Sequence, residues 1–230
     1  MSKQLTINNG QLANGEHLTG KNFPIFLKVS AHFFSYIFHP LLVPLYVVYF
    51  LVYIHPSYLS GFSQGEKMQV LLIVVLNAVF FPLISVLLLK GVGFIQSIFL
   101  HTQKDRIIPY IACGIFFFWT YHIFRQQTQY PLIFPSFFFG VLLSSSAALI
   151  ANIYFKISMH AIGMGGLLGL FLVIMAYNTM LMTWPLCIAL LITGIVCTSR
   201  LIISSHSPKE IYWGLFIGLI CQLVAAVVML

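Results

Sequence analysis

The sequence contains very few charged side chains, and acidic residues are the scarcest of them. Only 7% of its 230 residues are charged, whereas an ordinary soluble domain has about 25%. Hydrophobic residues make up 60% of the chain. The four acidic residues are Glu16, Glu66, Asp105 and Glu210. This composition excludes an ordinary soluble domain and indicates a protein that crosses a membrane several times.

The cysteines give no sign of a disulfide framework or of a zinc site. Cys113, Cys187, Cys197 and Cys221 all fall inside apolar runs, and no two of them have a paired spacing. Thiols in such runs behave as small hydrophobic side chains. The cysteines therefore favour neither a disulfide nor a zinc site, and we expect no bound cofactor.

The amino-terminal stretch lacks an apolar core. It is rich in Asn, Gly, Gln and Thr, which excludes a secretory signal and a membrane anchor in this stretch. We expect residues 1–23 to form a disordered polar tail and residues 24–230 to form one membrane domain.

Apolar runs long enough to cross a membrane fill the rest of the chain. A hydrocarbon core of about 30 Å requires about 20 apolar residues in a helix. The sequence predicts an all-α, polytopic membrane helix bundle with seven spans, or with six spans and one re-entrant segment, because some runs are short. The predicted spans are 33–53, 68–89, 110–124, 132–154, 161–176, 183–198 and 211–230.

The segments between these spans alternate between two faces, and one face collects most of the basic residues. The formal net charge is +7, and the basic residues stand singly between apolar runs. This distribution favours anionic lipid head groups over nucleic acid as partners. The tendency of basic loops to stay inside predicts that this face is cytoplasmic, and we expect the protein in a bacterial inner membrane. The residues assigned to this face are Lys3, Lys21, Lys28, Lys90, Lys104, Arg106, Lys156, Arg200 and Lys209, against Lys67 and Arg125 on the other face.

Three segments on the basic face carry side chains suited to phosphate chemistry, and the most informative one ends at Glu210. It contains Arg200, His206 and Glu210 within the twelve residues from Ser199 to Glu210. If the chain is helical after His206, the four-residue spacing brings His206 and Glu210 together. A cation, a nitrogen nucleophile and an acid that orients it can act on a phosphoryl group. The run Ser207-Pro208-Lys209-Glu210 also fits a capping box, in which Glu210 would close the helix start instead.

The second segment is Ser158-Met159-His160, at the joint between two predicted spans. If Ser158 caps the following helix, His160 lies in its first turn beside free backbone amides that can bind an anion. A protonated His160 could then give a proton to a departing alkoxide. The alternative is a plain helix cap with an interfacial histidine. Glycines at four-residue spacing follow and indicate close helix packing.

The first segment carries Lys104 and Arg106 shortly before Pro109, a residue that suits the first turn of a helix. The two cations could bind phosphate oxygens, or they could extend to lipid phosphates and only anchor the helix. His39, which precedes Pro40 on the same face, could line the site or simply lie at the membrane interface.

Taken in their order along the chain, the three segments resemble the signature of the type 2 phosphatidic acid phosphatase superfamily. The third motif of that family has the form Ser-Arg-x5-His-x3-Asp. Here Ser199, Arg200, His206 and Glu210 keep every spacing, with Glu in place of Asp.

The other two motifs match less completely. The second keeps the Ser and His of the family in Ser158 and His160 but lacks the Pro-Ser-Gly lead-in. In the first, Lys104 and Arg106 are separated by one residue, whereas the family commonly places Lys six residues ahead of Arg-Pro.

The resemblance implies a metal-independent phosphatase that acts on a lipid phosphate through a phosphohistidine. His206 would attack phosphorus, Glu210 would orient its ring, and His160 would protonate the leaving oxygen. An isoprenyl diphosphate or a glycerolipid phosphate is the implied substrate. The implied phosphate-binding residues are Arg200, Arg106, Lys104, Ser158 and Ser199.

Two other functions fit the same residues. A lipid or anion transporter could use Arg200, His206 and Glu210 as a binding or proton-relay site without hydrolysis. A membrane assembly protein could also retain a degenerate site, because the first motif is irregular.

Overall fold

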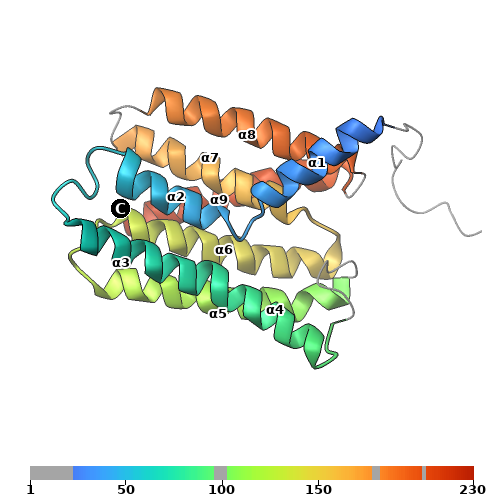
Figure 1. Cartoon of the computed structure of the whole chain (residues 1–230), viewed down its shortest axis with the longest axis horizontal. Helices are drawn as coiled ribbons and strands as arrows, with labels where there is room; N and C mark the ends of the chain where they lie inside the picture. Colours follow the sequence, from blue (N-terminus) through green and yellow to red (C-terminus); the bar gives the residue numbers. More distant parts are fainter. Residues whose placement is uncertain (1–22, 96–102, 178–181, 204–205) are drawn as a thin grey trace, which may run out of the picture.

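The computed structural model describes residues 23–95, 103–177, 182–203 and 206–230, so the predicted polar tail of residues 1–23 lies outside the described residues except for Phe23. Within these ranges the secondary structure is helical, without β-strands, and six helices are long and apolar enough to cross a membrane. The protein is therefore an all-α integral membrane bundle (Figure 1). The six helices are the continuous segment Gln64–Gly91, α5 (Gln103–Gln126), α6 (Ile133–Tyr154), α7 (Met159–Tyr177), α8 (Thr183–Ile202) and α9 (Pro208–Met229).

The first predicted span is broken. Instead of one helix over 33–53, the chain forms α1 (Ile25–Ile37) and α2 (Val43–Tyr49), and α2 continues into a π-helical segment, η1 (Phe50–Ile54). Pro40 has no amide proton for a helix and disfavours helical geometry at the residue before it. The prediction of a single continuous span here is therefore wrong.

The helix that crosses the membrane next has an irregular middle. It consists of α3 (Gln64–Val74), a π-helical segment η2 (Val75–Phe80) and α4 (Phe81–Gly91). Its start is fixed by Ser63, whose side chain and backbone exchange hydrogen bonds with Glu66 in a complete capping box. Pro82 is the second residue of α4, just after the π-helical segment, as expected where a local π-helical distortion accommodates a missing amide proton.

Helix α5 begins earlier than the sequence suggested. It starts at Gln103, so that Pro109 lies inside the helix and not in its first turn. Asp105 falls in that first turn, where a carboxylate interacts favourably with the positive end of the helix dipole. The charged stretch predicted to precede the span is thus part of the helix itself.

One end of the bundle carries most of the basic side chains. We call it the basic end; it holds the starts of α5, α7 and α9 and the ends of α4, α6 and α8 (Figure 1). Every described lysine and arginine lies at or near this end except Lys67, at the start of α3, and Arg125, at the end of α5. The uneven distribution predicted from the sequence is confirmed for the described residues.

Helices α7 and α9 pack closely along one another, and both start at the basic end. Glycines make this approach possible. A Cβ atom on Gly218 would overlap the carbonyl of Ile162, and one on Gly165 would overlap the carbonyl of Leu215. The close packing predicted from the glycine spacing is confirmed, and it places the first turns of two parallel helices side by side.

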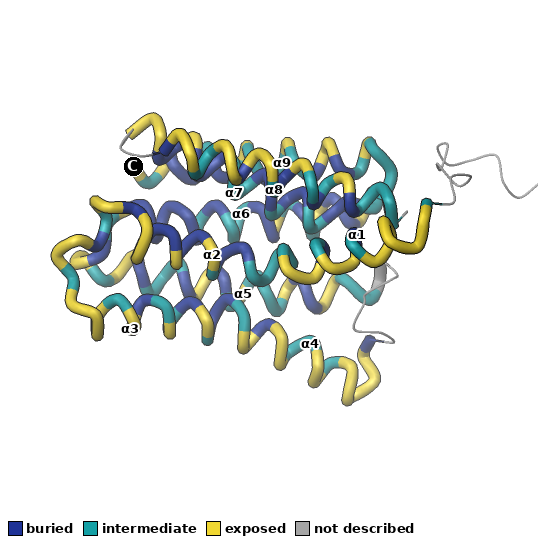
Figure 2. The backbone as a smooth tube through the Cα atoms, turned by 45° about the horizontal axis from the view of Figure 1, so that its top comes forward, coloured by how far each residue is buried: buried dark blue, intermediate teal, exposed yellow. Residues whose placement is uncertain are grey.

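The outer surface of the bundle is apolar, as a lipid environment requires. Large hydrophobic side chains are exposed around the bundle, among them Phe26, Trp184 and Val227, while the interior is filled by residues such as Phe134 and Phe138 (Figure 2). Without a hydrophobic driving force between helices in lipid, small residues that allow close contact stabilise such bundles.

We predict that Gly218→Ala lowers the thermal unfolding midpoint of the protein in detergent, because the new methyl group must displace the backbone of α7. Overpacking of this kind costs about 1–3 kcal/mol. Gly194→Ala on α8 is the matched control, since a Cβ there meets nothing within 4 Å. Equal midpoints for the two variants would contradict the close α7–α9 contact.

Candidate active site

The start of α9 holds His206 against Glu210. The Nδ1 atom of His206 lies 2.6 Å from Oε2 of Glu210, and the side chains are only 6% and 22% exposed, respectively. Because the carboxylate can only accept, Nδ1 carries the proton of this hydrogen bond. The remaining ring nitrogen, Nε2, then has a free lone pair when the ring is neutral.

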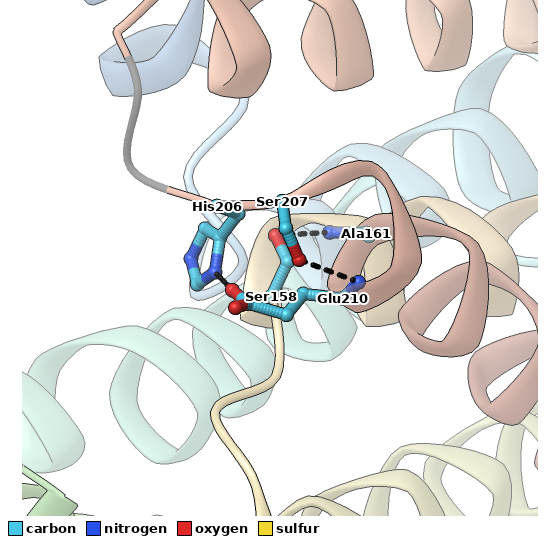
Figure 3. A network of polar contacts seen from close by, with 5 residues as sticks. All are labelled: Ser158, Ala161, His206, Ser207 and Glu210. Carbon is cyan, nitrogen blue, oxygen red and sulfur yellow. Dashed lines mark hydrogen bonds and ion pairs between the residues drawn. The ribbon is translucent and has the colours of Figure 1, made fainter. Parts of the chain in front are cut away.

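The sequence allowed two roles for Glu210, orienting His206 or closing the start of α9, and the structure distinguishes between them. Ser207 caps α9 by accepting a hydrogen bond from the backbone N–H of Glu210 at 3.4 Å, while the Glu210 carboxylate binds His206 instead of returning to the cap. The capping box of Ser63 and Glu66 on α3 shows the alternative arrangement. Glu210 therefore orients the histidine (Figure 3).

His206 is held in its neutral form. Burial is the main reason that its pKa is lowered to about 3, and the nearby charges of Arg200, Lys156 and Arg106 lower it further. A neutral imidazole with its proton on Nδ1 is the nucleophilic form of histidine.

Ser158 caps α7 next to the start of α9. Its hydroxyl accepts a hydrogen bond from the backbone N–H of Ala161 at 3.4 Å, and the residue is fully buried. Figure 3 shows this cap beside the one that Ser207 forms. Two helix starts, each with a positive dipole end, therefore face the same region.

His160 lies in the first turn of α7, as the sequence predicted, and its ring is fixed by α1. Its Nε2 atom donates to the backbone carbonyl of Ser35 at 3.0 Å. His160 also interacts electrostatically with Arg200, His39 and His206. Only Nδ1 is left for any exchange of protons with a bound substrate.

Cations from three parts of the chain surround these histidines. Arg200, in the last turn of α8, interacts with both His206 and Arg106, the latter from α5. The Nε atom of Arg200 is buried and has no hydrogen-bond partner within the described parts of the chain. A buried donor of this kind carries a large desolvation cost, which an anionic ligand would offset.

Lys156 is a member of the site that the sequence reasoning did not select. It belongs to the linker between α6 and α7, and it is partly buried. Burial lowers its pKa; Glu210 opposes that change, and Arg106 and Arg200 add to it. The signal available in the sequence was its position two residues before Ser158, in a linker too short to carry it away from the site.

Two of the proposed phosphate-binding residues are not brought into this cluster by any described contact. The hydroxyl of Ser199 donates to the carbonyl of Ile195 at 2.8 Å, so a bond from it to a phosphate would require the side chain to rotate. Lys104 lies within α5, but its side chain falls outside the described residues. Their assignment as phosphate ligands stays a prediction.

Among the described residues, no three His, Cys, Asp or Glu side chains gather in a way that could hold a metal ion. Comparison with models of known protein families, with curated proteins and with solved structures gives no match for this chain.

We predict that His206 stays neutral, with its proton on Nδ1, in the folded protein at pH 5. Its lowered pKa means that protonation occurs only as the pH falls toward 3, and acidification below about 6.5 then favours the unfolded chain, which binds the proton more readily. Nitrogen NMR of histidine-labelled protein, assigned with His206→Gln, measures the protonation state. A doubly protonated ring at pH 5 would disprove this assignment.

Proposed function

We propose that the protein is an integral membrane lipid phosphate phosphatase that acts through a phosphohistidine intermediate. The observation that supports this most directly is the 2.6 Å contact between His206 and Glu210 at a helix start surrounded by cations. The contact supplies a neutral, oriented nucleophile, and the cations supply a binding site for its phosphoryl target. The sequence resemblance to the type 2 phosphatidic acid phosphatase superfamily points to the same chemistry.

In the first step of the proposed reaction, Nε2 of His206 attacks phosphorus. A nitrogen–phosphorus bond forms as the bond from phosphorus to the leaving oxygen breaks. Glu210 stabilises the positive charge that develops on the ring through its bond to Nδ1. The negative charge of the bound phosphate favours the doubly protonated form of His160. In that form Nε2–H stays on the carbonyl of Ser35, and Nδ1–H gives its proton to the leaving oxygen.

In the second step, a water molecule attacks the phosphohistidine. His160 takes a proton from the water, the nitrogen–phosphorus bond breaks, and inorganic phosphate leaves. His206 returns to its neutral form and His160 to its protonated form, so that the cycle closes.

The charged groups of the site fit the oxygens of a transferring phosphoryl group. Arg200, Arg106 and Lys156 interact with one another and with His206, and the starts of α7 and α9 add their dipoles. Phosphoryl transfer gains most of its catalysis from such electrostatic stabilisation and positioning. We assign to Lys156 the phosphate-binding role that the resemblance gives to a lysine of the first motif.

The bundle also fits a lipid substrate. The site lies at the basic end, where helices with apolar outer surfaces stop. A lipid can keep its chain in the bilayer while its phosphate reaches the cations. An isoprenyl diphosphate and a glycerolipid phosphate both meet these requirements, and the distribution of basic residues favours a cytoplasmic location of the site.

A transporter is the second candidate, and one feature favours it. The break between α1 and α2 lies close to the site, because His39 in that break interacts with His160. Discontinuous helices mark the substrate sites of many transporters. In that case the same cations would bind the anion without hydrolysis.

We predict that the purified protein in detergent releases inorganic phosphate from dioctanoyl phosphatidic acid or from a short-chain isoprenyl diphosphate in the presence of a chelator. His206→Ala should abolish release, because the nucleophile is gone. Colorimetric phosphate detection provides the measurement, and His122→Ala on α5, away from the basic end, is the control. Hydrolysis that persists in His206→Ala would rule out the proposed nucleophile.

We also predict that Arg200→Ala and Lys156→Ala each lower kcat by about a hundredfold or more, as the loss of one electrostatic donor typically does. Arg125→Ala, at the other end of the bundle, should leave kcat unchanged. Movement of the lipid phosphate across proteoliposomes without phosphate release would favour the transporter instead.

A further inference from the structure

The break between α1 and α2 is an ordered piece of structure. The hydroxyl of Tyr46 donates to the carbonyl of Ile37 at 2.8 Å, and the backbone N–H of Leu42 donates to the carbonyl of His39 at the same distance. Carbonyl groups that the interrupted helix leaves open are therefore bonded. The neighbouring Pro40 packs beside Gly163 of α7, where a Cβ would lie 3.6 Å from that of Pro40.

Such a break has a cost in an apolar setting. Non-helical backbone at membrane depth is tolerated only where protein surrounds it or where it lines a polar cavity. Here the interruption falls where α1 packs against α8 and α2 packs against α7, next to the charged site. A break that is both bonded and positioned in this way indicates a function for the side chain that it carries inward.

That side chain is His39, and its tautomer is fixed by the break. Its Nδ1 atom accepts a hydrogen bond from the backbone N–H of Leu41 at 3.3 Å. A neutral ring that accepts at Nδ1 carries its proton on Nε2. His39 therefore offers one N–H donor from its outer nitrogen.

The surroundings of His39 are those of the proposed active site. Its ring lies 5.5 Å from the ring of His160, centroid to centroid, with the two planes at 84°. Burial lowers the pKa of His39, and the charge of Arg200 lowers it further. The ring is thus a neutral donor that stands near both the proposed proton donor and the buried guanidinium.

We propose that His39 is a further phosphate-binding residue, whose Nε2–H donates to an oxygen of the phosphoryl group held beside Arg200 and His160. The inference rests on the proposed function for the identity of the anion, and it adds a residue outside the three sequence motifs. The α1–α2 segment would then contribute two groups to the site: the ring of His39, and the carbonyl of Ser35, which accepts the hydrogen bond from His160. No proton transfer by His39 is required.

The test compares His39→Gln with His39→Met in the full-length protein in detergent. The two replacements have similar size and shape, but only glutamine has an N–H donor near the position of Nε2. Binding of inorganic phosphate is measured by calorimetry, and turnover of dioctanoyl phosphatidic acid is measured by phosphate release. His32→Met, at an exposed position on α1, is the control.

We expect His39→Met to weaken phosphate binding and to lower kcat/KM by about tenfold or more, as the loss of a hydrogen bond to a charged group does. His39→Gln should stay within about threefold of the wild type, because its amide preserves the donor. Unchanged phosphate binding in His39→Met overturns the proposal, and so does an equal loss in both variants, which would assign His39 a packing role. A loss of lipid turnover with normal phosphate binding also overturns it, because His39 would then contact another part of the lipid.

A second measurement applies if the variants fail to fold. In nitrogen NMR of the wild-type protein, the Nε2 signal of His39 should shift on addition of inorganic phosphate, while that of His32 should not. An unshifted His39 signal at saturating phosphate overturns the proposal. Phosphate binding without hydrolysis would disprove the phosphatase. The His39 contact would still be tested separately, by phosphate binding in the variants and by the NMR shift.

Discussion

The close contact between α7 and α9 is the constraint on which the site depends. Two helices that run in the same direction can bring their first turns together only if their axes approach closely. Gly165 and Gly218 allow that approach, because each faces a backbone carbonyl of the other helix where no Cβ would fit. Ser158 and Ser207 then cap neighbouring helices. A lipid environment makes small residues the natural means of bringing helices so close.

This arrangement concentrates positive electrostatic potential at the basic end of the bundle. Two dipole ends meet Arg200, Arg106 and Lys156, and Glu210 binds His206 and interacts with Lys156. Assembling such a group costs free energy in the absence of an anion, since like charges repel and burial removes water. The same features strengthen the binding of a phosphate. They also keep His206 neutral, which is the state that a nucleophile requires.

Much of the bundle follows from the sequence. Long apolar runs predicted seven crossing helices, or six with one re-entrant segment, and the described residues form six. The uneven distribution of basic residues was predicted from the alternation of these runs with charged segments. Two local details were wrong for a physical reason. Pro40 breaks a run that is apolar enough to span, while Pro109 lies within α5 without ending it. Proline limits the backbone in both places, but neighbouring helices decide whether the chain bends away or continues.

The sequence by itself determined the membrane setting and the spacing of Arg200, His206 and Glu210, since hydrophobicity and position along a helix are local properties. It left two uses for Glu210 and two for His39, and it put Lys156 on the basic face without selecting it for the site. Only the tertiary structure decided these points. The partners come from α1, α5, α8 and the α6–α7 linker, which are distant along the chain and meet through helix packing, and no local pattern encodes that meeting.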